Sequence, residues 1–175
     1  TNDELKLQVM EDIVLLHLIG VHVVLVHGGG PDISGMLKRV GKESVFKDGL
    51  RVTDKETMEI AQMVLAGKTN KNLVNLLESK GAKAIGISGI DGMLIEAKMN
   101  NPDLGFVGTI TGINPQPIHD LIEKGYIPVI STIGCDREGN SYNINADTAA
   151  ARIAGAMKAE RLITMTDIAG ILRDK

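Results

Sequence analysis

Val23–Pro31 (VVLVHGGGP) is an apolar, β-branched run that ends on three consecutive glycines and a proline. The apolar part predicts a buried strand over Val21–Val26, and the residues from Asp32 to Val40 predict a helix directly after the glycines. Glycines lack a Cβ atom and let backbone N–H groups approach an oxyanion, and the start of a helix adds a partial positive charge there. The stretch therefore predicts a site for a phosphate or a carboxylate, although a tight turn or a close packing contact would use the same glycines.

Strands and helices alternate on either side of this stretch. The other expected helices are Leu5–Leu16, Thr53–Leu65, Asn70–Lys80, Pro115–Lys124 and Asp147–Met157. The other expected strands are Val45–Arg51, which has hairpin character, Ala84–Ile87, Met93–Lys98, Val107–Thr111, Ile127–Ser131 and Arg161–Met165. Several strands are continuous apolar runs, which is typical of a parallel sheet covered on both faces. We predict an α/β fold: an open αβα sandwich with a mainly parallel central sheet.

Two local patterns carry finer predictions. Apolar residues at helical spacing, among them Leu5, Ile13 and Leu16, predict the buried face of the first helix. Thr53 and Glu56 have the spacing of a capping box, so the helix that follows should begin at Thr53.

Composition excludes several classes of function. The chain has 175 residues, 43% of them hydrophobic, and is expected to form one domain with a core. A net charge of −3 and an aromatic content of 2% argue against nucleic-acid binding, which needs a basic surface and usually aromatic faces. No apolar stretch is long enough to span a bilayer. The single Cys135 and the lack of a secretory pattern favour a cytoplasmic location, with Cys135 as a small buried residue.

Polar residues gather at three further places. Arg51, at the end of the hairpin, could clamp a carboxylate with its planar fork or could be an ordinary surface arginine. Asn143 and Asn145 alternate along an extended segment before Asp147, so the three side chains could converge, or Asn145 and Asp147 could cap the helix that follows. The segment Thr166–Leu172 ends a strand and contains a glycine, as an ordinary strand-to-helix connection also does.

In their order and spacing, these motifs resemble those of the amino-acid kinase family. The resemblance covers nearly the whole chain. It is carried by the strings His27–Pro31 (HGGGP), Asp48–Thr53 (DGLRVT) and Asn143–Asp147 (NINAD), with support from Gly125–Ser131 and Thr166–Leu172. The GLRVT string matches the branch that phosphorylates N-acetyl-L-glutamate. The resemblance therefore implies transfer of the ATP γ-phosphoryl group to the γ-carboxylate of that acceptor, a step of arginine biosynthesis.

The resemblance also implies roles for individual residues. Gly29 and Gly30 would contact the acceptor through their amides, and Arg51 and Asn143 would hold its α-carboxylate and acetamido end. Asp147 would be the acidic catalytic residue that orients lysines. The residues expected at the nucleotide site are Gly28, Thr166, Asp167, Ile168, Ala169, Gly170, Ile171 and Leu172. No histidine or cysteine has metal-ligand spacing, so no protein-bound metal site is expected. Mg²⁺ would instead arrive bound to ATP.

Family members are at least dimers, so a homodimer or larger homo-oligomer is expected. The family's two lysines, one on a first strand and one after the nucleotide loop, fall outside Thr1–Lys175. We therefore expect a single kinase domain truncated at both ends, mostly its acceptor-binding half, that is inactive alone. Two alternatives stay open: another acyl- or carbamoyl-phosphate-forming kinase of the same fold, which would not need Arg51, and a non-catalytic module that binds acetylglutamate. His27 is expected to be structural, since an ionised carboxylate acceptor needs no general base.

Overall fold

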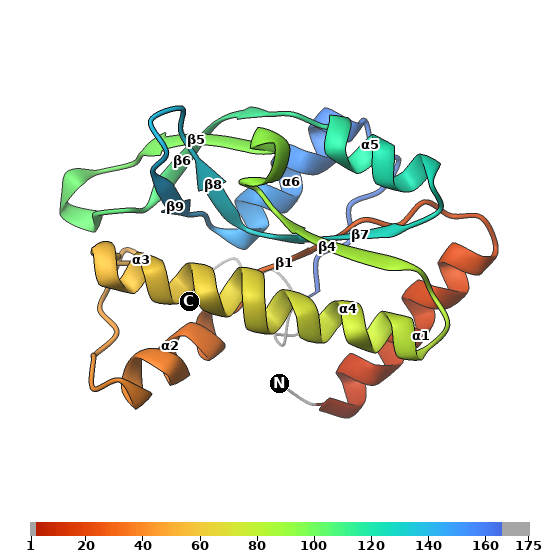
Figure 1. Cartoon of the computed structure of the whole chain (residues 1–175), viewed down its shortest axis with the longest axis horizontal. Helices are drawn as coiled ribbons and strands as arrows, with labels where there is room; N and C mark the ends of the chain where they lie inside the picture. The colour runs from red at the N-terminus through yellow and green to blue at the C-terminus, as the bar shows by residue number, and fades with distance from the viewer. Residues whose placement is uncertain (1–2, 166–175) are drawn as a thin grey trace, which may run out of the picture.

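The computed structural model describes residues 3–165, which form alternating helices and strands (Figure 1). The helices are α1 (Asp3–Leu18), α2 (Gly30–Arg39), α3 (Lys55–Gln62), η1 (Met63–Thr69), α4 (Asn70–Ser79), η2 (Asp91–Met93), η3 (Pro102–Leu104), α5 (Gln116–Glu123) and α6 (Ala146–Met157). The strands are β1 (Leu25–His27), β2 (Phe46–Lys47), β3 (Leu50–Arg51), β4 (Ala84–Ser88), β5 (Ile95–Met99), β6 (Gly108–Ile113), β7 (Ile127–Ser131), β8 (Ile133–Cys135) and β9 (Ser141–Asn143).

The central sheet is parallel and has the order β1-β7-β4. Its middle strand, β7, is buried along its whole length and was predicted with the observed bounds. At the carboxyl edge, Ser131 is in register with His27 on one side and with Ser88 on the other. Ligands of open α/β sheets bind outside this edge, so the register brings the glycine stretch and the end of β7 to the place where a site is expected.

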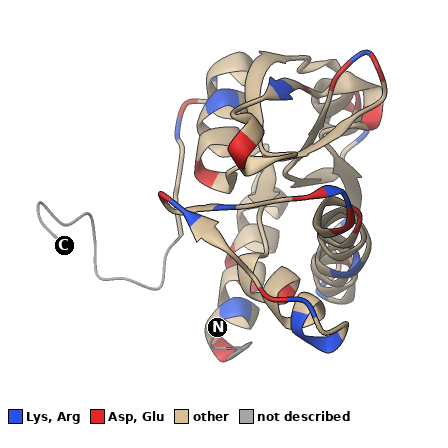
Figure 2. Cartoon of the chain, turned by 90° about the vertical axis from the view of Figure 1, so that its left-hand side faces the viewer, with Lys and Arg blue, Asp and Glu red and all other residues tan. Residues whose placement is uncertain are grey.

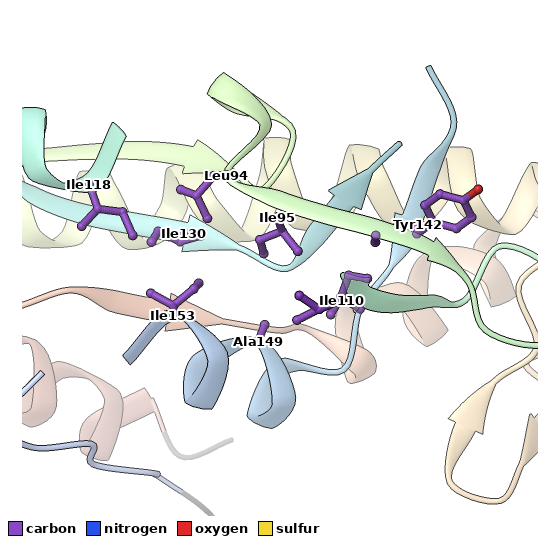
Figure 3. Packing of buried hydrophobic residues seen from close by; sticks show 10 residues of the cluster. Leu94, Ile95, Ile110, Ile118, Ile130, Tyr142, Ala149 and Ile153 are labelled. Atoms are coloured by element: carbon purple, nitrogen blue, oxygen red, sulfur yellow. The ribbon is translucent and has the colours of Figure 1, made fainter. Parts of the chain in front are cut away.

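Helices cover both faces of the central sheet, which confirms the predicted αβα sandwich. Ile127 and Val129 of β7 pack with α1 and α4 on one face. Ile130 points to the opposite face, where it joins Ile118 of α5 and Ile153 of α6 (Figure 3). Successive side chains of a strand alternate between faces, and a strand that is apolar at every position therefore requires helices on both sides.

A second sheet, of order β6-β5-β8-β9, extends the fold beyond the parallel strands. It is mostly antiparallel: β5 pairs with β6, and β8 pairs with β9. The predicted hairpin is formed by β2 and β3. Its turn residues Asp48 and Gly49 have positive φ angles of 52° and 79°, the conformation that favours Asp-Gly in tight hairpins.

Asp54, not Thr53, caps α3, so the predicted capping box is wrong by one residue. The Asp54 carboxylate accepts a hydrogen bond of 2.8 Å from the Thr57 N–H. Thr53 is fully buried in a bridge to Gly105, and its hydroxyl donates to the Arg51 carbonyl oxygen over 2.7 Å. Because tertiary pairing keeps Thr53 extended, the helix can begin only after it.

The two helices expected over Thr53–Leu65 and Asn70–Lys80 form one continuous helical segment. The π-helix η1 joins α3 to α4 without a break. The residues between the predicted helices, which include Gly67, belong to η1, and Leu65 and Asn70 on either side of them are buried. Burial of these flanking residues overrides the weak helix propensity of the glycine.

At the ends of the described region, one expectation is confirmed only in part and one is wrong. In α1, Ile13 is buried as expected, together with Met10 and Val14, whereas Leu5 and Leu16 are exposed. Apolar residues of α1 occur on all of its sides, so their spacing in the sequence does not specify which face is buried. Arg161–Met165 forms no strand and is exposed. A strand needs a neighbour to share backbone hydrogen bonds, and no described strand pairs with this segment.

Charged residues lie mainly on the helices and the connections, with both signs interspersed (Figure 2). Lys42 pairs with both Asp54 and Glu56 at 2.7 Å. Within residues 3–165 no helix is both long and apolar enough to cross a membrane.

Replacing Asp54 with alanine should lower the free energy of unfolding by about 1 kcal/mol, because the cap of α3 is lost. The hydrogen bond from Lys42 is the main reason that the pKa of Asp54 falls to about 2. A lowered folded-state pKa stabilises the fold above the unfolded value near 4, and this contribution disappears as the pH falls towards 2. Asn also caps helices, so Asp54→Asn should keep the cap but lose this part of the pH dependence. Urea unfolding of the three proteins between pH 2 and 7 tests both statements, and identical pH profiles for wild type and Asp54→Asn would contradict the second.

Candidate functional site

A cavity of about 220 Å³ lies at the carboxyl edge of the central sheet, at the end of β1. Gly28, Gly29 and Gly30 line it, as the sequence predicted. A Cβ atom on Gly28 would approach the Ala146 Cβ to 3.0 Å, and one on Gly29 would lie 2.7 Å from Leu65 Cδ2. Close packing therefore disfavours a side chain at the first two glycines, whether or not a ligand binds.

The start of α2 opens onto the same cavity. Gly30 is the first residue of this ten-residue helix, and no side chain caps its N-terminus. Helix N-termini carry unpaired backbone N–H groups and a partial positive charge, which favour anions. The structure shows the packing role of the glycines, and the uncapped start of α2 makes the same loop suited to an anion.

Arg51 lines the cavity and is only 6% exposed, so it is not an ordinary surface arginine. One terminal nitrogen, Nη2, donates to the Gly30 carbonyl oxygen at 2.9 Å and to Ser34 Oγ at 2.8 Å. The other, Nη1, donates to Ser44 Oγ at 2.7 Å, and the guanidinium carbon lies 4.6 Å from the centroid of the Phe46 ring. These contacts fix the orientation of the guanidinium towards the start of α2.

No ion pair neutralises Arg51 among the described residues. Burial lowers the pKa of its guanidinium, and no nearby carboxylate opposes that effect. Guanidinium has five N–H donors, so three hydrogen bonds leave donor capacity free. A buried charge without a counter-ion is costly, and a bound anion would remove that cost.

Asn143 also lines the cavity, at the end of β9. Its Nδ2 lies 3.4 Å from Thr53 Oγ1, while its backbone N–H donates to the Phe106 carbonyl oxygen at 2.8 Å. Asn145 caps α6, accepting from the Thr148 N–H at 2.9 Å, so its side chain has the helix-capping role that the sequence left open. Asn143 and Arg51 therefore meet at one cavity, as predicted.

Asp147 lies exposed on the first turn of α6, and it does not line the cavity. Its neighbour Ala146 does line it. Of the three polar residues expected to converge, Asn143 and Asn145 thus line the cavity, with Asn145 Oδ1 capping α6, and Asp147 lies outside the lining. The predicted nucleotide-site residues Thr166, Asp167, Ile168, Ala169, Gly170, Ile171 and Leu172 lie outside the described residues.

His27 is engaged at both ring nitrogens. Its Nδ1 lies 2.9 Å from the Gly28 carbonyl oxygen, and its Nε2 lies 3.1 Å from Asn70 Nδ2. These partners assign the proton to Nδ1 and make Nε2 an acceptor. Burial lowers the pKa of His27, which favours this neutral form. His27 thus has a structural role, holding the first glycine of the loop.

Sequence reasoning missed Ser34, Ser44 and Thr132. The two serines orient Arg51, and Thr132 lines the cavity directly after β7. The position of Thr132 could have been noticed, because it follows an apolar strand at the edge where ligands bind. Nothing in the sequence pattern indicated a role for the two serines, since they contact Arg51 only in the folded chain.

A cavity lined by a glycine loop and a buried arginine, at the carboxyl edge of a parallel sheet inside an αβα sandwich, defines an α/β protein with a place suited to a small anion. The chain belongs to the amino acid kinase family, whose profile matches residues 1–175. It is 54% identical to an acetylglutamate kinase of Brachyspira hyodysenteriae over 176 residues, which cover 99% of this chain and 61% of the relative. It is 55% identical to an acetylglutamate kinase of Caldicellulosiruptor saccharolyticus, covering 99% of this chain and 62% of the relative. The chain thus spans about three fifths of the length of these relatives.

Solved structures share the fold. The crystal structure of smu.665 from Streptococcus mutans has a TM-score of 0.88 and 31% identity, covering 94% of this chain and 68% of that one. An N-acetylglutamate synthase of Neisseria gonorrhoeae has a TM-score of 0.74 at 23% identity, covering 88% of this chain and 36% of that one. The second likeness supports the fold alone.

Proposed function

We propose that this chain forms the acceptor-binding part of an enzyme that phosphorylates the γ-carboxylate of N-acetyl-L-glutamate with ATP, in arginine biosynthesis. The observation that carries the proposal is the buried guanidinium of Arg51, which has no counter-ion among the described residues and faces a cavity with a glycine loop. The relatives at 54% and 55% identity that are named acetylglutamate kinase support this substrate.

In the proposed complex, Arg51 and Asn143 hold the α-carboxylate and the acetamido group. Arg51 suits this task because its charge and its two unused N–H donors, one on Nε and one on Nη1, are available to a carboxylate, and its contacts to Ser34 and Ser44 restrain it beforehand. The amides of Gly29 and Gly30 face the acceptor. Phosphoryl transfer depends mostly on such positioning and on charge stabilisation, and the ionised acceptor needs no base.

ATP supplies the phosphoryl group in this proposal, and Asp147 keeps its predicted role as the acidic residue that orients catalytic lysines. Within the described region no three His, Cys, Asp or Glu side chains are placed to hold a metal ion. The described residues therefore do not by themselves fit Mg²⁺, and none of the roles above depends on it. Mg²⁺, the cytoplasmic location and the homo-oligomeric state stay predictions.

Another acyl- or carbamoyl-phosphate-forming kinase of the family is the second candidate, and Arg51 argues against its carbamoyl form. A carbamate acceptor has a single carboxylate, the one that is phosphorylated. It would leave the separate guanidinium of Arg51 without an anion. A non-catalytic acetylglutamate-binding module would share the cavity and would differ only in lacking phosphoryl transfer.

Calorimetric titration of the chain with N-acetyl-L-glutamate tests the acceptor site directly. We expect saturable binding of N-acetyl-L-glutamate and much weaker binding of L-glutamate, whose free ammonium group would meet a cavity that already holds the Arg51 charge. Equal affinity for the two ligands, or no binding by a chain that circular dichroism shows to be folded, would contradict the proposal. Phosphorylation of acetylglutamate by a chain of the relatives' full length then separates the kinase from the binding module.

A further inference from the structure

Thr132 has a buried hydroxyl group that no protein atom satisfies among the described residues. It follows β7 directly and is 1% exposed, and its Oγ1 has no hydrogen-bond partner. Its backbone carbonyl, in contrast, accepts a hydrogen bond from the Ile144 N–H at 3.1 Å. A buried hydroxyl without a partner costs roughly 1–3 kcal/mol, so such a group in a cavity wall indicates a ligand atom.

Thr132 belongs to the wall of the cavity that contains the glycine loop. Thr132 lines this cavity together with Gly28 and Ala146. Ser131 is in register with His27, so Thr132 and Gly28 are the next residues on two neighbouring parallel strands. Thr132 therefore lies at the Gly28 end of the glycine loop.

Arg51 lies at the other end of the same loop. Its Nη2 donates to the Gly30 carbonyl oxygen and to Ser34 on α2. A ligand with two carboxylates can thus place one beside the Arg51 guanidinium and extend the other towards Gly28 and Thr132. N-acetyl-L-glutamate has this form, since its γ-carboxylate is separated from its α-carboxylate by two methylene groups and the α-carbon.

We propose that the Thr132 hydroxyl donates a hydrogen bond to the distal carboxylate of the acceptor, the one that receives the phosphoryl group. This inference rests on the proposed function and names a group that recognises the reacting end of the substrate. A carboxylate accepts hydrogen bonds and cannot donate them, so it matches the donor that the hydroxyl has free. The bond fixes the distal carboxylate beside the amides of the glycine loop.

Thr132→Val tests the inference because valine has nearly the shape of threonine without the hydroxyl. We expect its affinity for N-acetyl-L-glutamate to fall by about tenfold or more, as for a lost hydrogen bond to a charged group. Its affinity for N-acetyl-L-2-aminobutyrate, which lacks the distal carboxylate, should not change. Thr132→Ser keeps a hydroxyl and should retain most of the affinity for N-acetyl-L-glutamate.

Ser131→Ala is the matched control. Its Oγ is also buried without a partner, but Ser131 does not line the cavity. We expect this variant to bind N-acetyl-L-glutamate as the wild type does. Thermal unfolding without ligand gives a second readout, in which Thr132→Val should be at least as stable as the wild type, since the hydroxyl has no protein partner to lose.

The outcomes separate this inference from the proposed function. If the wild type binds N-acetyl-L-glutamate and Thr132→Val binds it equally well, the role of Thr132 is wrong and the proposed function stands. A Thr132→Val chain that is clearly less stable without ligand would also overturn the role, because the hydroxyl would then have a structural partner. If the folded wild type binds neither acetylated ligand, the proposed function fails, and the role of Thr132 fails with it.

Discussion

Replacing Arg51 with alanine should weaken the binding of N-acetyl-L-glutamate by about 2 kcal/mol or more, roughly thirtyfold in the dissociation constant. The guanidinium is 6% exposed, is held by Ser34, Ser44 and the Gly30 carbonyl, and has no counter-ion among the described residues. Its free donors and its charge are therefore available to a ligand carboxylate. Calorimetric titration of the wild type and the variant measures the change.

Two variants control the Arg51 experiment. Arg51→Lys keeps a positive charge but loses the planar fork, so we expect an intermediate affinity. Arg39→Ala removes an exposed arginine at the end of α2, outside the cavity lining, and should bind as the wild type does. If Arg51→Ala and Arg39→Ala bind N-acetyl-L-glutamate equally well, Arg51 does not hold the acceptor.

Replacing Gly86 with alanine should lower the free energy of unfolding by about 2–3 kcal/mol, through overpacking and a disrupted buried amide. A Cβ atom on Gly86 of β4 would lie 1.8 Å from Asn70 Oδ1 and 2.8 Å from Asn70 Cγ. Asn70 cannot move away easily, because it is fully buried and its Nδ2 donates to the Val129 carbonyl oxygen at 2.9 Å. The same Nδ2 lies 3.3 Å from the Ile87 carbonyl oxygen and 3.1 Å from His27 Nε2.

Gly35→Ala is the control for Gly86→Ala. Gly35 lies inside α2 with open space where a Cβ would be placed, so alanine should be neutral or stabilising by up to about 1 kcal/mol. Urea unfolding of both variants gives the comparison. Equal unfolding free energies would show that Asn70 yields to the added methyl group and does not hold the three strands together.

The Asn70 contacts link fold stability to the site. Asn70 contacts His27 at the end of β1, the Ile87 carbonyl oxygen of β4 and the Val129 carbonyl oxygen in the middle of β7, and His27 in turn contacts the Gly28 carbonyl oxygen. Disturbing Asn70 should therefore also shift the glycine loop. We expect Gly86→Ala to bind N-acetyl-L-glutamate more weakly than Gly35→Ala, measured by calorimetry at a temperature where both are folded.

The sequence by itself determined β4 and β7, the helices that cover the sheet and the glycine loop, whereas β1 begins at Leu25 and not at Val21 as predicted. These features are local: β7 is apolar at every position, and a β-branched run that ends on Gly28 leaves few conformations open. Arg51 and Asn143 were likewise identified from short strings, and the structure brings them to one cavity.

The tertiary structure alone decided the features that depend on contacts distant in sequence. Pairing of Thr53 with Gly105 moved the start of α3 to Lys55, and packing of α1 selected Met10, Ile13 and Val14 as its buried face. The burial of Arg51, its support by two serines and the unpartnered hydroxyl of Thr132 also arise only in the folded chain. Spacing along a sequence specifies which side of a helix or strand a residue occupies, but its partners are set by how the elements pack.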